Sequence, residues 1–314
     1  MVASASRRSF LQFGLAAAGA ALSPGWVKVA AAQGSPDPGT VPVKATKLAD
    51  NVYLLQGVGG NMVLQTGSDG LLLIDASYAP AVPRIREAIS ALVPTPTSAP
   101  SLLINTHWHG DHTGGNEGMH DAGFTILAHR KTRDRLSHTQ VMKLFKRTVQ
   151  PSPAGALPTQ VFDETFTIYR NGDTLDLRYF TPAHTDSDIH IHFQNANVLH
   201  LGDIYFNGFY PFIDEGTAGN IDGMIKGSKE GLSLASPETK IVPGHGPLGT
   251  KAELQEYHDM LATVREKVAA LKKQGLSEQE ALAKKPTAEF DAKWGKGFMA
   301  PDVFAGIVYR TVQA

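Results

Sequence analysis

Residues 107–112 read HWHGDH and directly follow the short apolar run Leu102-Leu103-Ile104. The apolar run predicts a buried β-strand, so these six residues lie at a strand end. Four of their side chains offer imidazole nitrogen or carboxylate oxygen, the atoms with which proteins bind zinc and similar divalent ions. A sharp turn would aim His107 and His109 in one direction and Asp111 and His112 in another. One short loop could therefore serve two metal ions.

The composition of the whole chain narrows the chemistry further. The 314 residues include no cysteine, which excludes disulfides, thiolate-bound iron–sulfur clusters and a cysteine nucleophile, so His, Asp or Glu must hold any metal. The chain has 29 Lys and Arg residues and 30 Asp and Glu residues, so we do not expect a basic surface that would bind nucleic acid or an anionic membrane. The expected partner is a small molecule, and the oligomeric state stays open.

The regular structure is expected to be α/β. Apolar runs at 52–55, 62–65 and 71–74, separated by glycine-containing turns, predict an opening β-meander. Ile85, Ile89 and Leu92 recur at helical spacing and lead to the strand before the HWHGDH stretch, as in a βαβ unit. Further strands are predicted at 125–128, 165–169, 175–180, 189–193, 198–201 and 241–242, and a long amphipathic helix at 251–273. Two groups of strands with interspersed helices favour two sheets packed between helices.

The N-terminal region is expected to lie outside this fold. Residues 1–32 resemble a twin-arginine export signal, because Arg7-Arg8 is followed by Phe10-Leu11 and a weakly apolar Ala/Gly run. No segment approaches the roughly 20 apolar residues of a membrane span. We expect an export signal at 1–32, a linker at 33–47 and a hydrolase domain with a C-terminal helical segment at 48–314. The expected location of the protein is the periplasm.

The 107–112 stretch resembles the His-x-His-x-Asp-His signature of the metallo-β-lactamase superfamily. The later members of the superfamily pattern are matched by His184 in 181–185, Asp203 in 200–203 and His245 in 243–246, so the resemblance covers about residues 48–250. It implies a four-layer αβ/βα sandwich with the site at the edge between the two sheets. It also implies the following roles: His107, His109 and His184 bind a first zinc ion, Asp111, His112 and His245 bind a second, Asp203 bridges them, and Asp75 braces the histidine loop without binding metal.

The function expected from this set is hydrolysis of a carbonyl compound. Two divalent ions about 3.5–4 Å apart lower the pKa of a shared water, and the resulting bridging hydroxide attacks an ester, thioester, lactone or lactam. Asp111 and Asp203 are the expected catalytic residues, with Asp111 orienting the water. Zinc is the expected metal, and iron and manganese stay open.

Several alternatives remain at this stage. A true β-lactamase is one, although the subclass that has a cysteine ligand where Asp203 stands is excluded. The others are an accessory hydrolase of a periplasmic redox system and a non-catalytic metal-binding module. A glyoxalase II-like role is less favoured, because residues 246–249 carry no basic side chain for glutathione. The candidate substrate-pocket residues, for which core packing is the alternative, are Trp108, Tyr205, Asn207 and Tyr210.

Overall fold

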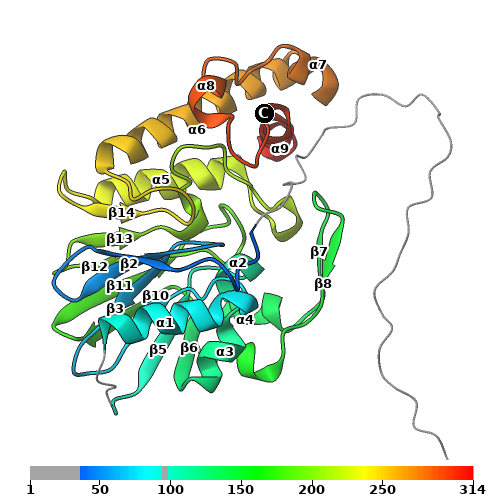
Figure 1. Ribbon diagram of the computed structural model, residues 1–314. Helices are drawn as coiled ribbons and strands as arrows, with labels where there is room; N and C mark the ends of the chain where they lie inside the picture. Colours follow the sequence, from blue (N-terminus) through cyan, green and yellow to red (C-terminus); the bar gives the residue numbers. More distant parts are fainter. Residues whose placement is uncertain (1–35, 94–97, 314) are drawn as a thin grey trace, which may run out of the picture.

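Two β-sheets lie between layers of helices in this computed structural model, which describes residues 36–93 and 98–313 (Figure 1). The first sheet has the strand order β1-β2-β3-β4-β5-β6-β9. Its strands are β1 Lys44–Lys47, β2 Val52–Gln56, β3 Met62–Gln65, β4 Leu72–Ile74, β5 Ser101–Asn105, β6 Phe124–His129 and β9 Gln160–Phe162. The meander β1–β4 is antiparallel, whereas β4, β5, β6 and β9 run parallel to one another.

The second sheet has the order β10-β11-β12-β13-β14. Its strands are β10 Thr165–Arg170, β11 Asp173–Tyr179, β12 Ile189–Phe193, β13 Val198–His200 and β14 Lys240–Val242. Only the β13–β14 pair is parallel. A separate hairpin consists of β7 Gln140–Met142 and β8 Arg147–Val149.

Helices cover the outer face of each sheet (Figure 1). The α-helices are α1 Val82–Leu92, α2 Gly110–Thr113, α3 Asn116–Asp121, α4 Arg130–Leu136, α5 Ile221–Leu234, α6 Lys251–Lys273, α7 Glu278–Ala283, α8 Asp291–Trp294 and α9 Pro301–Thr311. Short 3-10 helices lie at η1 Ala79–Ala81, η2 Ala154–Ala156, η3 Gly202–Ile204 and η4 Glu215–Thr217. None of the helices in these ranges is long and apolar enough to cross a membrane.

Three hydrophobic clusters hold the layers together. Between the sheets, Ile104 belongs to the same cluster as Ile191 and Val242. The neighbouring Leu103 points the other way along its strand and packs in the cluster that contains Ile85 of α1. The outer face of the second sheet packs against α5, α6 and α9. Because each buried aliphatic side chain stabilises the fold by about 1.5–3 kcal/mol, these three interfaces fix the layer order. The predicted four-layer αβ/βα sandwich is confirmed.

Some local predictions differ from the structure. Residues 44–47, expected to end a linker, form edge strand β1, because their backbone pairs with 53–56 although their side chains lack an apolar pattern. Helix α5 was not predicted, since three of its residues are glycines of low helix propensity. Those glycines allow close approach: a Cβ at Gly223 would lie 1.9 Å from the Pro182 carbonyl oxygen. The expected export signal and residues 33–35 lie outside the described residues.

Candidate metal centre

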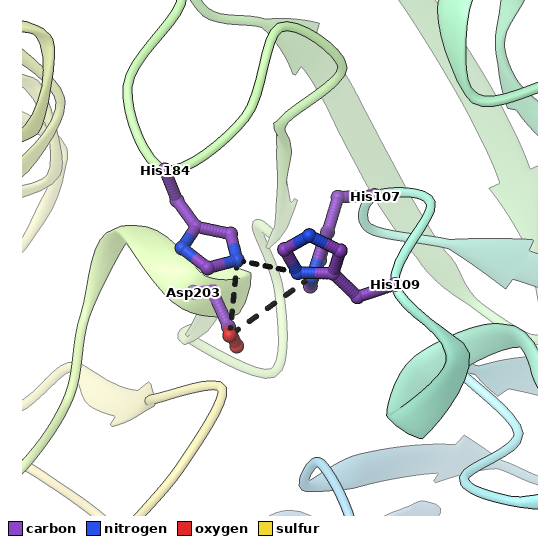
Figure 2. A group of neighbouring side chains, drawn as sticks. All are labelled: His107, His109, His184 and Asp203. Atoms are coloured by element: carbon purple, nitrogen blue, oxygen red, sulfur yellow. Dashed lines mark hydrogen bonds and ion pairs between the residues drawn. The ribbon is translucent and has the colours of Figure 1, made fainter. Parts of the chain in front are cut away.

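The predicted ligands meet at one edge of the two sheets. Residues 107–112 follow β5 and continue into α2, Asp203 lies in η3 just after β13, and His245 lies in the loop after β14. His184 comes from the connection between β11 and β12. Because β5, β13 and β14 all end at this edge, loops that are far apart in the sequence place their side chains together (Figure 2).

His107, His109, His184 and Asp203 form the first ligand group, in which one nitrogen or oxygen atom from each residue lies within 4.8 Å of the others. His109 Nδ1 lies 2.8 Å from His184 Nε2, and His184 Nε2 lies 3.3 Å from Asp203 Oδ2 (Figure 2). His107 Nε2 lies 3.9 Å from the same oxygen. All four side chains are buried. Their atoms converge on one point, as a coordinated cation would require.

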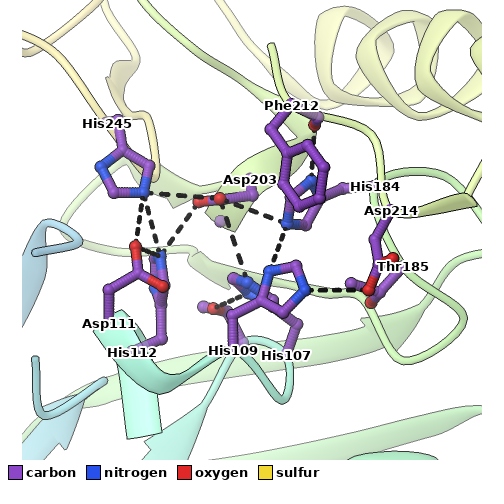
Figure 3. Close-up of polar contacts among 12 residues, drawn as sticks. His107, His109, Asp111, His112, His184, Thr185, Asp203, Phe212, Asp214 and His245 are labelled. Atoms are coloured by element: carbon purple, nitrogen blue, oxygen red, sulfur yellow. Dashed lines mark hydrogen bonds and ion pairs between the residues drawn. The ribbon is translucent and has the colours of Figure 1, made fainter. Parts of the chain in front are cut away.

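Asp111, His112 and His245 form the second ligand group. His245 Nε2 lies 3.1 Å from Asp111 Oδ2 and 3.3 Å from His112 Nε2. Asp203 joins the two groups, because its Oδ1 lies 3.1 Å from His112 Nε2 and its Oδ2 lies 3.4 Å from His245 Nε2 (Figure 3). Asp111 and His245 keep 23% and 19% of their side chains exposed, so the second group forms the open side of the centre.

The donor set fits a pair of divalent cations. It combines imidazole nitrogens with carboxylate oxygens, which zinc accepts. The buried Nε2 of His107 has no hydrogen-bond partner within residues 36–93 and 98–313, although burying such an atom unpaired is costly. A cation among these atoms would satisfy that nitrogen. The residues can therefore hold metal.

The protonation states of the first ligand group also suit metal binding. Burial lowers the pKa of His184 to about 4 and is the main cause that lowers the pKa of His107 well below its usual range, which leaves both imidazoles neutral. Burial alone would raise the pKa of Asp203, but the surrounding histidines, His245 first, outweigh it and hold that pKa well below its usual value. A neutral imidazole and an ionised carboxylate are the forms that ligate a cation. In the second group, Asp203 and Asp111 outweigh burial and raise the pKa of His112 well above its usual value and the pKa of His245 to about 9, so these two imidazoles must release a proton when metal binds.

Hydrogen bonds behind the ligands fix their orientation. Asp75 Oδ2 lies 2.7 Å from His112 Nδ1, and its two oxygens accept from the backbone N–H and hydroxyl of Thr106 at 2.8 and 2.7 Å. His184 Nδ1 donates to the carbonyl oxygen of Phe212 at 2.8 Å. These bonds hold the hydrogen on Nδ1 and leave Nε2 free to face the centre. Asp75 has φ +60°, a strained conformation for a residue with a side chain.

Asp214 braces a ligand and was not predicted from the sequence. Its Oδ2 lies 3.1 Å from His109 Nε2 and accepts from the Thr217 hydroxyl at 2.9 Å, while its Oδ1 accepts from the Gly216 backbone N–H at 3.0 Å (Figure 3). Asp214 is 4% exposed. No motif near residue 214 connects it with a histidine 105 positions earlier, so no local signal could have identified it.

The Asp214→Asn variant should bind zinc about 10- to 100-fold more weakly, the usual effect of removing such a brace. With Oδ1 still accepting from Gly216, the new amide N–H₂ would face His109 Nε2 and force its hydrogen onto Nδ1, the nitrogen that faces the centre. Competition with a chromogenic zinc chelator measures the affinity. Asp163→Asn is the matched control, since Asp163 is 63% exposed and pairs with Arg130. Wild-type affinity in Asp214→Asn would contradict this role.

The four residues expected to line a substrate pocket lie in different surroundings; they are Trp108, Tyr205, Asn207 and Tyr210. Trp108 is 2% exposed, and its ring centroid lies 4.6 Å from that of His109. Asn207 supports the loop that carries His245, because its Nδ2 donates to the Pro247 carbonyl oxygen at 3.1 Å and its backbone N–H donates to the His245 carbonyl oxygen at 2.9 Å.

Tyr205 and Tyr210 are fully buried and do not line a pocket, which corrects the expectation for both. The Tyr205 ring packs against Tyr257 of α6, and the Tyr210 hydroxyl donates to Asp291 Oδ1 at 2.9 Å. The apolar cluster under α6 and α9 takes up these two rings.

Comparisons with known proteins identify the family of this chain. The family model of the metallo-beta-lactamase superfamily matches residues 55–245. A hydroxyacylglutathione hydrolase from Nitrosococcus oceani is 30% identical over 46% of this chain and 47% of its own length. An acyl-coenzyme A thioesterase from Homo sapiens is 27% identical over 62% of this chain and 72% of its own length. The chain thus spans about half the length of the first of these relatives.

The fold has solved counterparts. A metallo-beta-lactamase from Pontibacter korlensis superimposes with a TM-score of 0.56, at 16% sequence identity, over 70% of this chain and 99% of its own. An identity this low shows the fold alone. The family match covers the strands and loops that carry the seven clustered residues, from β2 to His245. The chain therefore belongs to the metallo-beta-lactamase superfamily.

Proposed function

We propose that this chain is a hydrolase that uses two zinc ions to cleave an ester or a thioester. One observation carries the proposal: Asp203 touches both ligand groups, so the two groups make one centre rather than two separate sites. The names of the relatives support the substrate class, because one is a thioesterase and the other a hydroxyacylglutathione hydrolase. A true β-lactamase remains the second candidate, because a solved metallo-beta-lactamase shares the fold.

When bound, two divalent cations lower the pKa of a water molecule and polarise a carbonyl group. The chain's own residues supply the negative charge of the centre and the acceptor for the attacking water. Asp203 supplies a buried negative charge between the two groups. Burial would raise the pKa of Asp111, but the nearby His112 and His245 outweigh burial and hold that pKa well below its usual value. Asp111 is therefore an ionised acceptor at the open side of the centre, where it can orient an attacking water and take its proton.

Export to the periplasm is part of the proposal and rests on Arg7-Arg8 and the residues around them. Fractionation of cells that express the full chain tests it, with Arg7→Lys/Arg8→Lys as the variant. The wild-type protein should reach the periplasmic fraction and the variant should stay in the cytoplasm. Equal distribution of the two proteins would refute the export signal.

The substrate class is tested with the zinc-loaded full chain. We expect kcat/KM in the usual enzyme range of about 10⁴ to 10⁸ M⁻¹s⁻¹ for at least one acyl ester or thioester. A chromogenic cephalosporin should be cleaved at least about tenfold less efficiently, a difference of 1.4 kcal/mol in transition-state binding. Faster cephalosporin cleavage would favour the β-lactamase alternative. If no carbonyl substrate shows metal-dependent turnover, the remaining alternative is a non-catalytic metal-binding module.

A further inference from the structure

Two rows of phenylalanine rings lead from the ligand histidines to the surface. In the first row, the Phe206 ring stacks on His245 with centroids 5.3 Å apart, and Phe209 lies 5.7 Å further along. Phe298 ends this row, 6.1 Å from Phe209 and 45% exposed. An exposed ring that continues a buried row from a metal ligand offers apolar contact to a molecule entering the centre.

The second row starts at the other ligand group. The Phe212 ring stacks on His109 at 5.8 Å and lies 5.7 Å from His184. Phe145, in the turn of the β7–β8 hairpin, lies 5.0 Å from Phe212 and is 38% exposed. Each ligand group is thus flanked by a row that ends in an exposed ring. An apolar group of a substrate can lie along either row while its carbonyl reaches the ligands.

The β7–β8 hairpin also brings positive charge. It carries Lys143, Lys146 and Arg147, and no Asp or Glu occurs between residues 139 and 162. The hairpin stands out from the sheets (Figure 1), and these three side chains are exposed. Such a segment attracts anions and not cations.

Arg147 is the cation best placed to act on a substrate. It pairs across the hairpin with Met142, so both side chains project from the same hairpin face, and Met142 packs against the hydrophobic cluster beneath α6 and α9. Within residues 36–93 and 98–313 no carboxylate forms an ion pair with Arg147. Arg147 follows Phe145 by two residues on the same hairpin, and the Phe145 ring contacts Phe212, which stacks on the ligand His109.

We propose that the substrate is an acyl thioester with an apolar acyl group and a leaving group that carries negative charge. The acyl group lies along the ring rows that end at Phe145 and Phe298, and Arg147, with Lys143, binds the anionic leaving group. This inference rests on the proposed ester or thioester hydrolysis and specifies its substrate.

The test uses four thioesters and the zinc-loaded full chain. Acetyl and hexanoyl groups are each attached to coenzyme A, which carries phosphates, or to N-acetylcysteamine, which is neutral. For wild-type protein, hexanoyl-coenzyme A should have the highest kcat/KM of the four. Phe145→Ala/Phe298→Ala should reduce the preference for hexanoyl over acetyl about 10-fold, the scale of lost apolar contact in a substrate pocket. The change should appear mainly in KM.

The charge is tested separately. Lys143→Gln/Arg147→Gln should reduce the preference for coenzyme A over N-acetylcysteamine about 5-fold, as expected for exposed charge pairs, and should weaken the salt dependence of that preference. Control variants remove an exposed aromatic ring or two exposed positive charges elsewhere: Tyr169→Ala, at a side chain 81% exposed on β10, and Lys273→Gln/Lys284→Gln, at exposed lysines near α7. The controls should keep both preferences.

The possible failures can be told apart. If wild-type protein cleaves acetyl-N-acetylcysteamine but the two preferences do not change in the variants, the substrate assignment is wrong while hydrolysis stands. If it cleaves none of the four thioesters but still cleaves an acyl ester, the substrate assignment is wrong while hydrolysis stands, and if it cleaves neither class, the proposed function fails. Calorimetric binding of S-hexyl-coenzyme A, a thioether that cannot be hydrolysed, gives a second readout. Phe145→Ala/Phe298→Ala and Lys143→Gln/Arg147→Gln should each bind it at least about 5-fold more weakly than the controls. Equal binding in all variants would also overturn the inference.

Discussion

Replacement of Asp203 by alanine should lower kcat/KM for a cleaved ester or thioester by roughly 10⁴-fold, the scale on which removing one member of a catalytic unit acts. Asp203 contacts histidines of both ligand groups, so its loss removes a ligand atom from each. It also leaves several buried imidazoles without their shared carboxylate. Bound zinc, measured by elemental analysis, should fall below two ions per chain.

Two further variants make the Asp203 result interpretable. Asp163→Asn changes a carboxylate on the surface and should keep full activity. Asp203→Asn preserves the volume of the side chain, which matters because Gly244 packs so closely that a Cβ there would lie 1.9 Å from Asp203 Oδ1. Circular dichroism should show that each variant is folded. A folded Asp203→Ala protein with near-wild-type turnover would refute the proposed centre.

Removal of the metal should abolish hydrolysis and destabilise the fold at the same time. A ligand present at about 1,000 times its Kd stabilises a protein by roughly 4 kcal/mol, which for a domain of this size corresponds to roughly 8–16 °C in Tm. The candidate ligands lie on loops from both sheets, so bound cations would join 107–112 to Asp203 and His245. Differential scanning calorimetry with and without a chelator measures the shift.

Adding zinc back separates loss of metal from irreversible unfolding. Activity and Tm should both return on addition of zinc after the chelator is removed. A protein that keeps its activity in excess chelator, with no zinc detected, would contradict metal-dependent hydrolysis. The Asp214→Asn variant should lose activity at a lower chelator concentration than wild type, because its zinc is held more weakly.

Much of the fold could be predicted from local pattern. The meander strands, the strand before HWHGDH and helix α6 have clear apolar periodicity, and α6 begins with a complete capping box formed by Thr250 and Glu253. Elements without such a signal were missed. Strand β1 depends on pairing with β2. Helix α5 contains glycines, and their lack of a side chain allows the helix to lie close to Pro182, Ile204 and Leu201.

At the site, too, local sequence does not predict which aromatic residues near Asp203 contact the ligand histidines. Tyr205, Phe206, Tyr210 and Phe212 lie in a sequence window of eight residues and are all buried in the same hydrophobic cluster. Phe206 and Phe212 contact ligand histidines, whereas Tyr205 packs on Tyr257 and Tyr210 bonds to Asp291. Which of them faces the centre depends on how η3 and the following loop lie against α6 and α9. Sequence spacing alone does not contain that information.

The sequence by itself determined the chemistry available to this protein: His, Asp and Glu but no cysteine as possible metal ligands, and a loop rich in such residues after a buried strand. Tertiary structure alone decided that Asp203 lies between the two groups, that Asp214 braces His109, and that Phe145 of the β7–β8 hairpin packs against Phe212. The physical reason is the range of the interactions. Strands and helices follow from periodic burial over a few residues, whereas the centre is assembled by loops that only the packing of two sheets brings within hydrogen-bond distance.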